Sequence, residues 1–312
     1  MLPQNRLGFG SAAIGNLYTT VDPSTAQQAV ETAWENGIRY FDTAPHYGLG
    51  LAEKRLGAAL AQYPRDDYVL SSKVGRLLVP AHQRSAVEHG FEVDEPLRRV
   101  WDFSRDGVLR SIEQSLTRLS TDRLDIVYLH DPDDHWPQAV GEAAPALAGL
   151  RDQGVIRAFG AGMNQSAMLT RFVRETSVDV VLLAGRLTLL DSSATKDLLP
   201  AAREHDVTVV AAGVFNSGLL ARPRPAQNAK YDYVQAPAEL ITRARAIADV
   251  CTTHGVTLPE AAIAYPLRFS EVTSVLLGMR SPTEVTENVR CYEVSVPEAL
   301  WEDLAGKGLT GA

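Results

Sequence analysis

The chain has 312 residues, 45% of them hydrophobic and 22% charged, with a formal net charge of -8. This composition is typical of a globular protein with a large apolar core, and its acidic balance excludes a general binder of nucleic acid or of anionic membranes. The two cysteines, Cys251 and Cys291, exclude a disulfide framework and are typical of a reducing compartment. No apolar run approaches the ~18 residues of a membrane span, and the first residues show no secretory signal. We therefore expect a cytoplasmic protein.

Short apolar runs alternate along the chain with longer segments of helical period. Most of these runs are apolar throughout, as expected for strands that are covered on both faces. The predicted strands are residues 7–10, 38–41, 68–71, 124–129, 156–160, 178–183, 207–211 and 272–277.

The segments between the runs place apolar residues on one helical face, which we interpret as core packing. In the first segment Asp22 is the expected N-cap, Pro23 the first helical residue and Asn36-Gly37 the stop. A second stripe runs from Val108 to Leu119. Further helices are expected at 143–153, 193–205 and 240–254.

Eight strand–helix units predict an α/β fold, a closed (β/α)8 barrel that forms a single domain over residues 1–312. An open doubly wound sheet is the alternative, but the strand count and the absence of a break in composition favour closure. Long connections at 75–104 and 213–233 each follow a strand. In a barrel they lie on the face where active sites are built, so we expect functional or lid-like loops.

Four chemically distinctive residues follow three neighbouring predicted strands. Asp42 and Tyr47 follow the second strand, Lys73 follows the third strand, and His130 follows the fourth strand. An ammonium beside a phenol favours the phenolate and lowers the phenol pKa from ~10. A carboxylate keeps that ammonium charged, and a histidine passes a proton or orients a substrate oxygen. The set predicts proton transfer at a carbinol oxygen.

Taken one at a time, these residues have simpler interpretations: a cap or turn for the Asp, packing for the Tyr and surface exposure for the Lys. Their joint placement favours the functional interpretation. The segment HDPDDH at 130–135 resembles a metal cluster, but its proline favours an extended turn and acidic loops are commonly solvated. We predict no metal site.

At these strand ends the sequence resembles the aldo-keto reductase superfamily, over nearly the whole chain. The matching motifs are FDTAPHYG at 41–48, SKVG at 72–75 and LDIVYLH at 124–130. The resemblance implies that Tyr47 is the acid/base, that Lys73 and Asp42 tune it, and that His130 orients the substrate or relays a proton. It also implies a nicotinamide cofactor lying across the barrel mouth, without a Rossmann domain.

Three blocks resemble the aldose 1-dehydrogenase branch of this superfamily, of the L-fucose or D-threo-aldose type: WDFSRDGV at 101–108, HDPDDH at 130–135 and GVFNSG at 213–218. That resemblance implies a small-molecule substrate, a cyclic hemiacetal that is oxidised to a lactone with NAD. Pyridoxal 4-dehydrogenase is similar as well and is the alternative, because nothing in the sequence separates a sugar from an aromatic hemiacetal. A general NADPH-dependent carbonyl reductase, a nicotinamide-binding regulatory subunit and a barrel hydrolase or isomerase without nicotinamide are further alternatives.

The segment GFGSAA at 8–13 loosely matches the G-x-G-x-x-G/A dinucleotide pattern, but too few residues precede it to form the first strand of a Rossmann unit. We interpret it as a βα turn in which Gly10 and Ser11 let a cofactor approach the backbone.

The segment after the eighth strand is expected to begin a helix that faces the cofactor. Ser281 and Glu284 predict a capping box, with Pro282 at the first helical position, and a helix N-terminus there favours a phosphate. By the resemblance, the adenosine half is held by Gly278, Met279, Arg280, Ser281, Glu287 and Asn288.

Glu284 also bears on the choice of cofactor. NADP-dependent relatives often carry an Arg at this position, whereas a carboxylate repels a 2′-phosphate and accepts from a ribose hydroxyl. Arg280 lies close enough in sequence to compensate. NAD is therefore the expected cofactor and NADP the alternative.

The nicotinamide end departs from the family pattern in three places. Asn164 falls one position late for the family's Ser-Asn pair, and an apolar stretch at 182–184 replaces the usual Gln. The stacking Tyr aligns near Ala212, so Phe215 is the stacking candidate, with core packing as the alternative, and Ser217 joins the predicted cofactor set.

Three residues close to His130 are candidates for contacts with the sugar. Asp131, Asp133 and Trp136 would bind its hydroxyls or a ring face. A solvated loop with one packing aromatic is the alternative.

Overall fold

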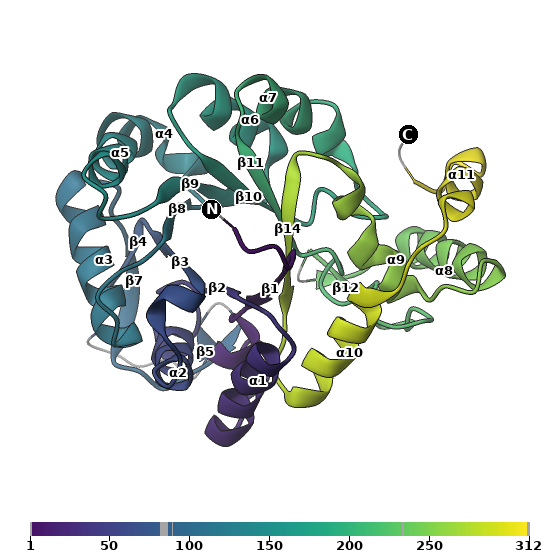
Figure 1. The fold of residues 1–312 in the computed structure, drawn as a ribbon, viewed down its shortest axis with the longest axis horizontal. Coiled ribbons are helices and arrows are strands. Elements are labelled where there is room, and N and C mark those ends of the chain that lie inside the picture. The colour runs from purple at the N-terminus through teal and green to yellow at the C-terminus, as the bar shows by residue number, and fades with distance from the viewer. Residues whose placement is uncertain (1, 82–86, 89, 233, 311–312) are drawn as a thin grey trace.

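A computed structural model describes residues 2–81, 87–88, 90–232 and 234–310. Eight parallel strands close into a barrel (Figure 1). The barrel strands are β1 (Leu7–Gly10), β2 (Tyr40–Asp42), β3 (Val69–Val74), β8 (Ile126–His130), β9 (Ala158–Met163), β10 (Val180–Ala184), β11 (Thr208–Ala212) and β14 (Val272–Gly278). β1 pairs with both β14 and β2, which completes the ring. The predicted barrel and its eight strands are confirmed, and the open-sheet alternative is wrong.

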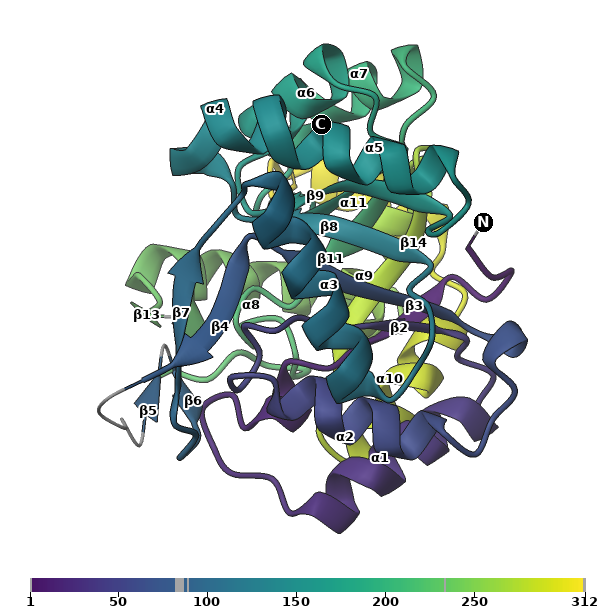
Figure 2. The ribbon, with the colours of Figure 1, turned by 90° about the vertical axis from the view of Figure 1, so that its left-hand side faces the viewer.

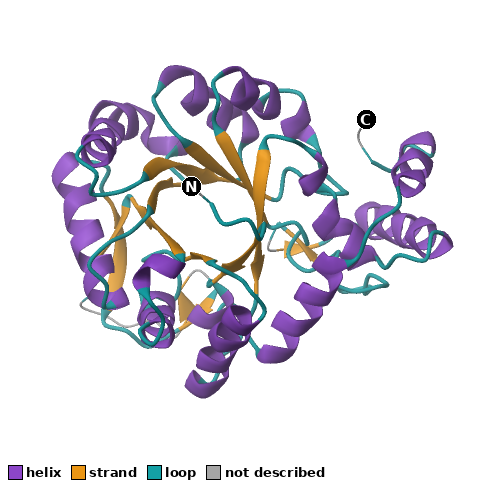
Figure 3. Cartoon of the chain, viewed as in Figure 1, coloured by secondary structure: helices purple, strands orange, loops and turns teal. Residues whose placement is uncertain are grey.

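The helices form a layer outside the strands (Figure 3). They are α1 (Pro23–Glu35), α2 (Leu51–Leu60), α3 (Arg105–Leu119), α4 (Trp136–Gln138), α5 (Ala144–Asp152), α6 (Ser166–Glu175), α7 (Leu198–Glu204), α8 (Ala238–Thr253), α9 (Leu258–Ala264), α10 (Pro282–Glu293) and α11 (Glu298–Gly306). Among the residues that the structure describes, no helix combines the length and apolar character that a membrane crossing requires.

The limits of α1 follow from the residues predicted to set them. The Asp22 carboxylate accepts from the backbone N–H groups of Ser24, at 2.9 Å, and Thr25, at 3.4 Å. Pro23 is the first helical residue, and Gly37 beyond the helix has a φ of 78°, a left-handed conformation that glycine adopts without strain.

The helix expected at 193–205 is divided in two. Ser193–Thr195 form a single 3-10 turn, and α7 begins only at Leu198. The Asp191 carboxylate accepts from the backbone N–H of Ser193 at 2.9 Å. The Asp197 carboxylate caps α7 by accepting from the backbone N–H of Leu198 at 2.6 Å. These short acidic side chains take backbone donors that a continuous helix would use, so the helix breaks.

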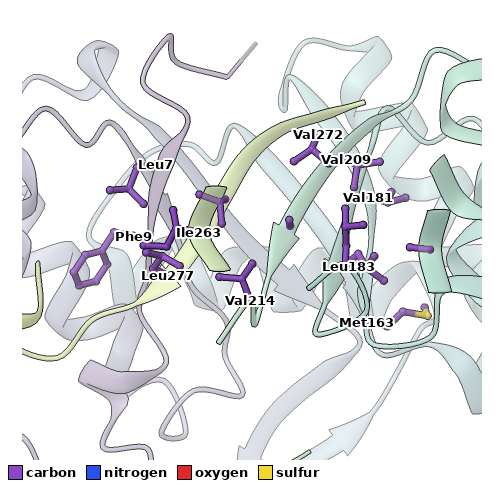
Figure 4. Close-up of a cluster of buried hydrophobic side chains, with 14 of the residues drawn as sticks. Leu7, Phe9, Met163, Val181, Leu183, Val209, Val214, Ile263, Val272 and Leu277 are labelled. Carbon is purple, nitrogen blue, oxygen red and sulfur yellow. The ribbon is translucent and has the colours of Figure 1, made fainter. Parts of the chain in front are cut away.

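The buried side chains form two main layers around the barrel wall. The larger layer lies between strands and helices, and Figure 4 shows part of it around Phe9, Val181 and Leu277. The smaller cluster includes Tyr40 and Tyr128, whose hydroxyl groups are 3.1 Å apart and fully buried. Along each strand the residues alternate between the two layers, which is why the predicted runs are apolar throughout.

In the described part of the long connection at 75–104 there are four short strands. β4 (Arg76–Pro80) pairs antiparallel with β7 (Leu97–Trp101), and β5 (Val87–Glu88) pairs with β6 (Phe91–Glu92). Figure 2 shows β4 and β7 side by side at one edge of the molecule. In the second connection the short strand β12 (Lys230–Tyr231) pairs with β13 (Val234–Gln235).

Candidate active site

The centre of the site is an ion pair between β2 and β3. Lys73 Nζ lies 2.6 Å from Asp42 Oδ2 and donates to the Thr43 carbonyl at 2.9 Å, with both charged side chains almost completely buried. Burial opposes a charge on Lys73, but the Asp42 carboxylate and Tyr47 outweigh it and raise the Lys73 pKa. The lysine is therefore held as an ammonium.

The strands that carry these residues end later in the chain than predicted. Asp42 is the last residue of β2, His130 is the last residue of β8, and Lys73 lies inside β3 instead of after it. The sequence pattern ended β3 at Ser71 because the next residues are polar. A charged residue continues the strand here because a buried carboxylate neutralises it.

Tyr47 lies in the turn between β2 and α2, beside the ammonium. Lys73 Nζ is 4.7 Å from the centroid of the Tyr47 ring, and a hydrogen bond to Tyr47 contributes to the raised Lys73 pKa. The next residue, Gly48, has a φ of 63°, and a Cβ there would lie 2.3 Å from the Gly15 carbonyl oxygen. Only glycine fits this turn, which directs Tyr47 toward Lys73.

His130 completes the predicted set. Its ring centroid is 5.9 Å from that of Tyr47. Burial, followed by the nearby charges of Arg76 and Lys73, lowers the His130 pKa well below its usual value, so the imidazole is neutral. Within the described residues, its buried Nδ1 has no hydrogen-bond partner.

A cavity of about 600 Å³ opens beside these groups. Tyr47, Lys73 and His130 all line this cavity. Asp42 does not line it, and its carboxylate lies behind Lys73, with which it forms the ion pair. Another cavity, of about 590 Å³, lies near Arg6 at the opposite end of the barrel and contains none of the four predicted catalytic residues. The four residues therefore converge on the mouth of the barrel, as the sequence predicted.

The same cavity is lined by residues that sequence reasoning missed. They include Leu17, Tyr18, His46, Arg76, Phe91 and Lys230. Arg76 begins β4, and the short apolar run Leu77–Val79 that follows it is the signal that would have indicated a strand there. No local pattern indicates that the others face this cavity, because most of them come from segments that are far apart in the chain.

A second cavity, of about 630 Å³, continues from the first and shares Ala12, Leu17 and Tyr18 with it. It runs between the loop after β11 and the start of α10. The predicted cofactor residues that line it are Phe215, Ser217, Gly278, Arg280, Glu284, Glu287 and Asn288. Asn164 lines the first cavity, and its side-chain amide donates to the Ala184 carbonyl at 3.0 Å.

Four predicted cofactor residues line neither of these cavities, within the part of the chain that the structure describes. They are Gly10, Ser11, Met279 and Ser281. Ser11 and Met279 are fully buried, so their side chains point into the protein and not into either cavity. Ala12 and Ala13 take the place expected for Gly10 and Ser11.

The start of α10 differs in detail from the expected capping box. Ser281 Oγ accepts from the Glu284 N–H at 3.3 Å, as predicted, but the Glu284 carboxylate accepts from the N–H of Arg280 instead of Ser281, at 2.9 Å. Glu284 also forms an ion pair with the Arg280 guanidinium at 3.4 Å, and that guanidinium donates to Thr19 at 2.8 Å. Arg280 is therefore already engaged by protein groups.

The three candidate sugar contacts close to His130 do not all lie in the catalytic cavity. The Trp136 ring centroid lies 4.7 Å from that of Phe172 and 3.7 Å from the guanidinium carbon of Arg171. Neither Trp136 nor Asp133 lines the catalytic cavity. Asp131 does line it. Among the described residues, no group of three or more His, Cys, Asp or Glu side chains is placed to hold a metal ion.

Comparisons with known proteins agree with this geometry. The Aldo/keto reductase family model matches residues 6–307. D-threo-aldose 1-dehydrogenase of Pseudomonas sp is 46% identical over 96% of this chain and 92% of that protein. Pyridoxal 4-dehydrogenase of Microbacterium luteolum is 39% identical over 97% of this chain and 94% of that protein. The holo form of the aldo-keto reductase AKR11C1 from Bacillus halodurans superposes with a TM-score of 0.76 and 27% identity, over 98% of this chain and 92% of that one.

Proposed function

The chain belongs to the aldo/keto reductase family, and from this membership and the geometry of its cavity we propose that it is an NAD(P)-dependent dehydrogenase that oxidises the cyclic hemiacetal of an aldose to a lactone. One observation carries the proposal. Lys73 is held as an ammonium between Asp42 and Tyr47 at the wall of the cavity, in a chain that is 46% identical to a D-threo-aldose 1-dehydrogenase.

The side chains have distinct roles in the oxidation. Tyr47 takes the proton of the anomeric hydroxyl, and the Lys73 ammonium stabilises the negative charge of the phenolate. Asp42 keeps Lys73 charged and in place, and neutral His130 shares a hydrogen bond with the reacting oxygen, which orients the substrate. A nicotinamide held in the second cavity would supply the redox chemistry that the side chains lack, as an acceptor of hydride.

The second cavity has the chemistry that a dinucleotide requires. It continues from the catalytic cavity, so one elongated ligand reaches both. The N-terminus of α10 and exposed Arg222 favour phosphate groups. Glu287 and Asn288 offer hydrogen bonds for the adenosine half.

Within this proposal NAD is preferred over NADP. Glu284 places a carboxylate in the second cavity, where a 2′-phosphate would meet a like charge and a ribose hydroxyl an acceptor. The compensation expected from Arg280 is weakened, because Glu284 and Thr19 already engage its guanidinium.

Pyridoxal is the second candidate substrate. The apolar side chains of Leu17, Phe91 and Leu182 line the catalytic cavity and would pack against an aromatic ring, and the chain is 39% identical to a pyridoxal 4-dehydrogenase.

We expect the cytoplasm as the compartment, since both thiols are buried and unpaired.

The test is a substrate panel run with both cofactors and followed by NADH or NADPH absorbance. L-fucose, D-arabinose, L-galactose and pyridoxal are compared by kcat/KM. The proposal expects an aldose to be the best substrate, with NAD. A clear preference for pyridoxal would replace the sugar, a clear preference for NADP would discard the cofactor assignment, and the lack of any turnover would discard the proposal.

A further inference from the structure

An ion pair in the wall of the catalytic cavity has no part in the proton transfer. Arg76, at the start of β4, pairs through Nη2 with Oδ2 of Asp131, the residue that follows β8. Both side chains line the cavity together with Tyr47 and His130. The Asp131 carboxylate lies 3.7 Å from His130 Nε2, so the pair adjoins the place where His130 would hold the reacting oxygen.

The Arg76 guanidinium is fixed from several sides. Besides Asp131, it contacts the His46 ring nitrogen at 3.2 Å and lies 4.5 Å from the centroid of the Trp101 ring. Its buried Nε has no hydrogen-bond partner in the described part of the chain. The guanidinium is therefore held rigidly, and it holds the carboxylate beside it.

Asp131 has an unusual backbone conformation. Its φ is 44°, in the left-handed region that Asp and Asn visit more readily than most residues, and its N–H donates to the Gly162 carbonyl at 3.0 Å. Arg76 engages Oδ2, and Oδ1 has no hydrogen bond to any described residue. The turn thus presents a carboxylate with an available acceptor at the cavity wall.

Other parts of this cavity are apolar. Leu17, Phe91 and Leu182 contribute them, whereas His46, Arg76 and Asp131 make the polar wall. A sugar ring has the matching division, with C–H groups on its faces and hydroxyls along its edge. An aromatic hemiacetal would use the apolar wall and leave the polar wall without a full set of partners.

We infer that Asp131, oriented by Arg76, binds the hydroxyl next to the reacting carbon, the C2 hydroxyl of an aldose, and so selects polyhydroxylated hemiacetals. This inference rests on the proposed function and adds to it the group that recognises the substrate. It makes Asp131 a specificity-determining residue, separate from the proton-transfer residues.

The test compares D-arabinose with 2-deoxy-D-ribose, sugars that differ only in the C2 hydroxyl. The parent enzyme, Asp131→Asn and Asp131→Ala are assayed on both with NAD. Asp133→Asn is the matched control, because it makes the same change in the same loop outside the cavity. NADH binding, followed by nucleotide fluorescence, reports whether each variant folds and keeps its cofactor site.

In the parent enzyme D-arabinose is expected to exceed 2-deoxy-D-ribose in kcat/KM by at least about 10-fold. The Asp131 variants should lose about 10- to 100-fold with D-arabinose, the usual effect of a hydrogen bond to a charged group. They should change little with 2-deoxy-D-ribose, so that the ratio falls toward one. NADH binding and the Asp133→Asn ratio should match the parent.

Two failures are distinguishable. If the parent oxidises aldoses and the Asp131 variants bind NADH but keep the parent ratio, this inference is wrong and the proposed function stands. If the parent oxidises no aldose of the panel, the proposed function fails and the inference falls with it. For a parent that uses L-fucose better than D-arabinose, L-fucose and 2-deoxy-L-fucose are the pair compared.

Discussion

Ser71 Oγ lies 2.7 Å from Asp42 Oδ1, and Lys73 Nζ is 2.6 Å from the other oxygen of the same carboxylate. A hydroxyl has one proton and a carboxylate only accepts, so the Ser71 proton points to Asp42. Tyr40, 3.2 Å from Ser71 Oγ, then donates to Ser71, and Tyr128, 3.1 Å away, donates to Tyr40. Burial raises the pKa of both tyrosines, so this chain of buried hydroxyl groups keeps its protons and stabilises the negative charge of Asp42.

Replacing Ser71 should therefore affect catalysis through Asp42. In Ser71→Ala we expect kcat to fall by about 10-fold, since the carboxylate loses a hydrogen bond worth about 1.5 kcal/mol and holds Lys73 less firmly.

Ser72→Ala is the matched control for this change. Ser72 is the next residue of β3, and its hydroxyl donates to Glu53 at 2.8 Å, away from the site. This variant should lose stability in thermal unfolding and keep its kcat. Equal effects of the two changes on kcat would show that the Ser71 bond is only structural.

Removing the Tyr47 hydroxyl should separate binding from turnover. Tyr47→Phe keeps the ring beside Lys73 but has no proton to exchange, so kcat should fall by about 10²- to 10⁴-fold. The NADH dissociation constant should stay near the parent value. A variant that turns over at nearly the parent rate would show that another group is the acid/base.

His130 should make stability depend on pH. Its pKa is lowered well below the usual value by burial and by Arg76 and Lys73, so the unfolded chain takes up a proton near pH ~6.5 while the folded protein does not. Stability is then full above pH ~6.5 and is lost as the pH falls toward the folded pKa, by up to about 1.4 kcal/mol per pH unit.

The measurement is the unfolding free energy of the parent and of His130→Gln between pH 7 and pH 5. The difference between the two proteins should shrink on acidification, because only the parent has this histidine. A difference that stays constant with pH would contradict a neutral, buried imidazole.

Glu284 should control the choice between the two dinucleotides. In Glu284→Gln the amide oxygen still accepts from the Arg280 N–H, but the like charge facing a 2′-phosphate is gone. The ratio of kcat/KM for NADP to that for NAD should rise by about tenfold, as expected from roughly 1.4 kcal/mol of removed repulsion. Glu293→Gln, the same change at the exposed far end of α10, should leave the ratio unchanged.

Much of the fold and the catalytic set was predictable, because both depend on patterns that are local in the chain. Apolar runs of strand length and the caps of α1 determine where elements form. In a closed parallel barrel the carboxyl ends of the strands meet at one face, so Asp42, Lys73 and His130 had to lie close together once the barrel was inferred.

The sequence alone determined the barrel and placed the four proposed catalytic residues at its mouth. The direction of single side chains was decided by the tertiary structure, because it depends on partners distant in the chain. Arg76 meets Asp131 only when β4 lies beside the end of β8, and Ser71 meets Tyr40 only through the register of β2 and β3. Met279 is adjacent to a residue that lines the second cavity, yet it packs into the core, because neighbouring residues at a strand end face opposite sides.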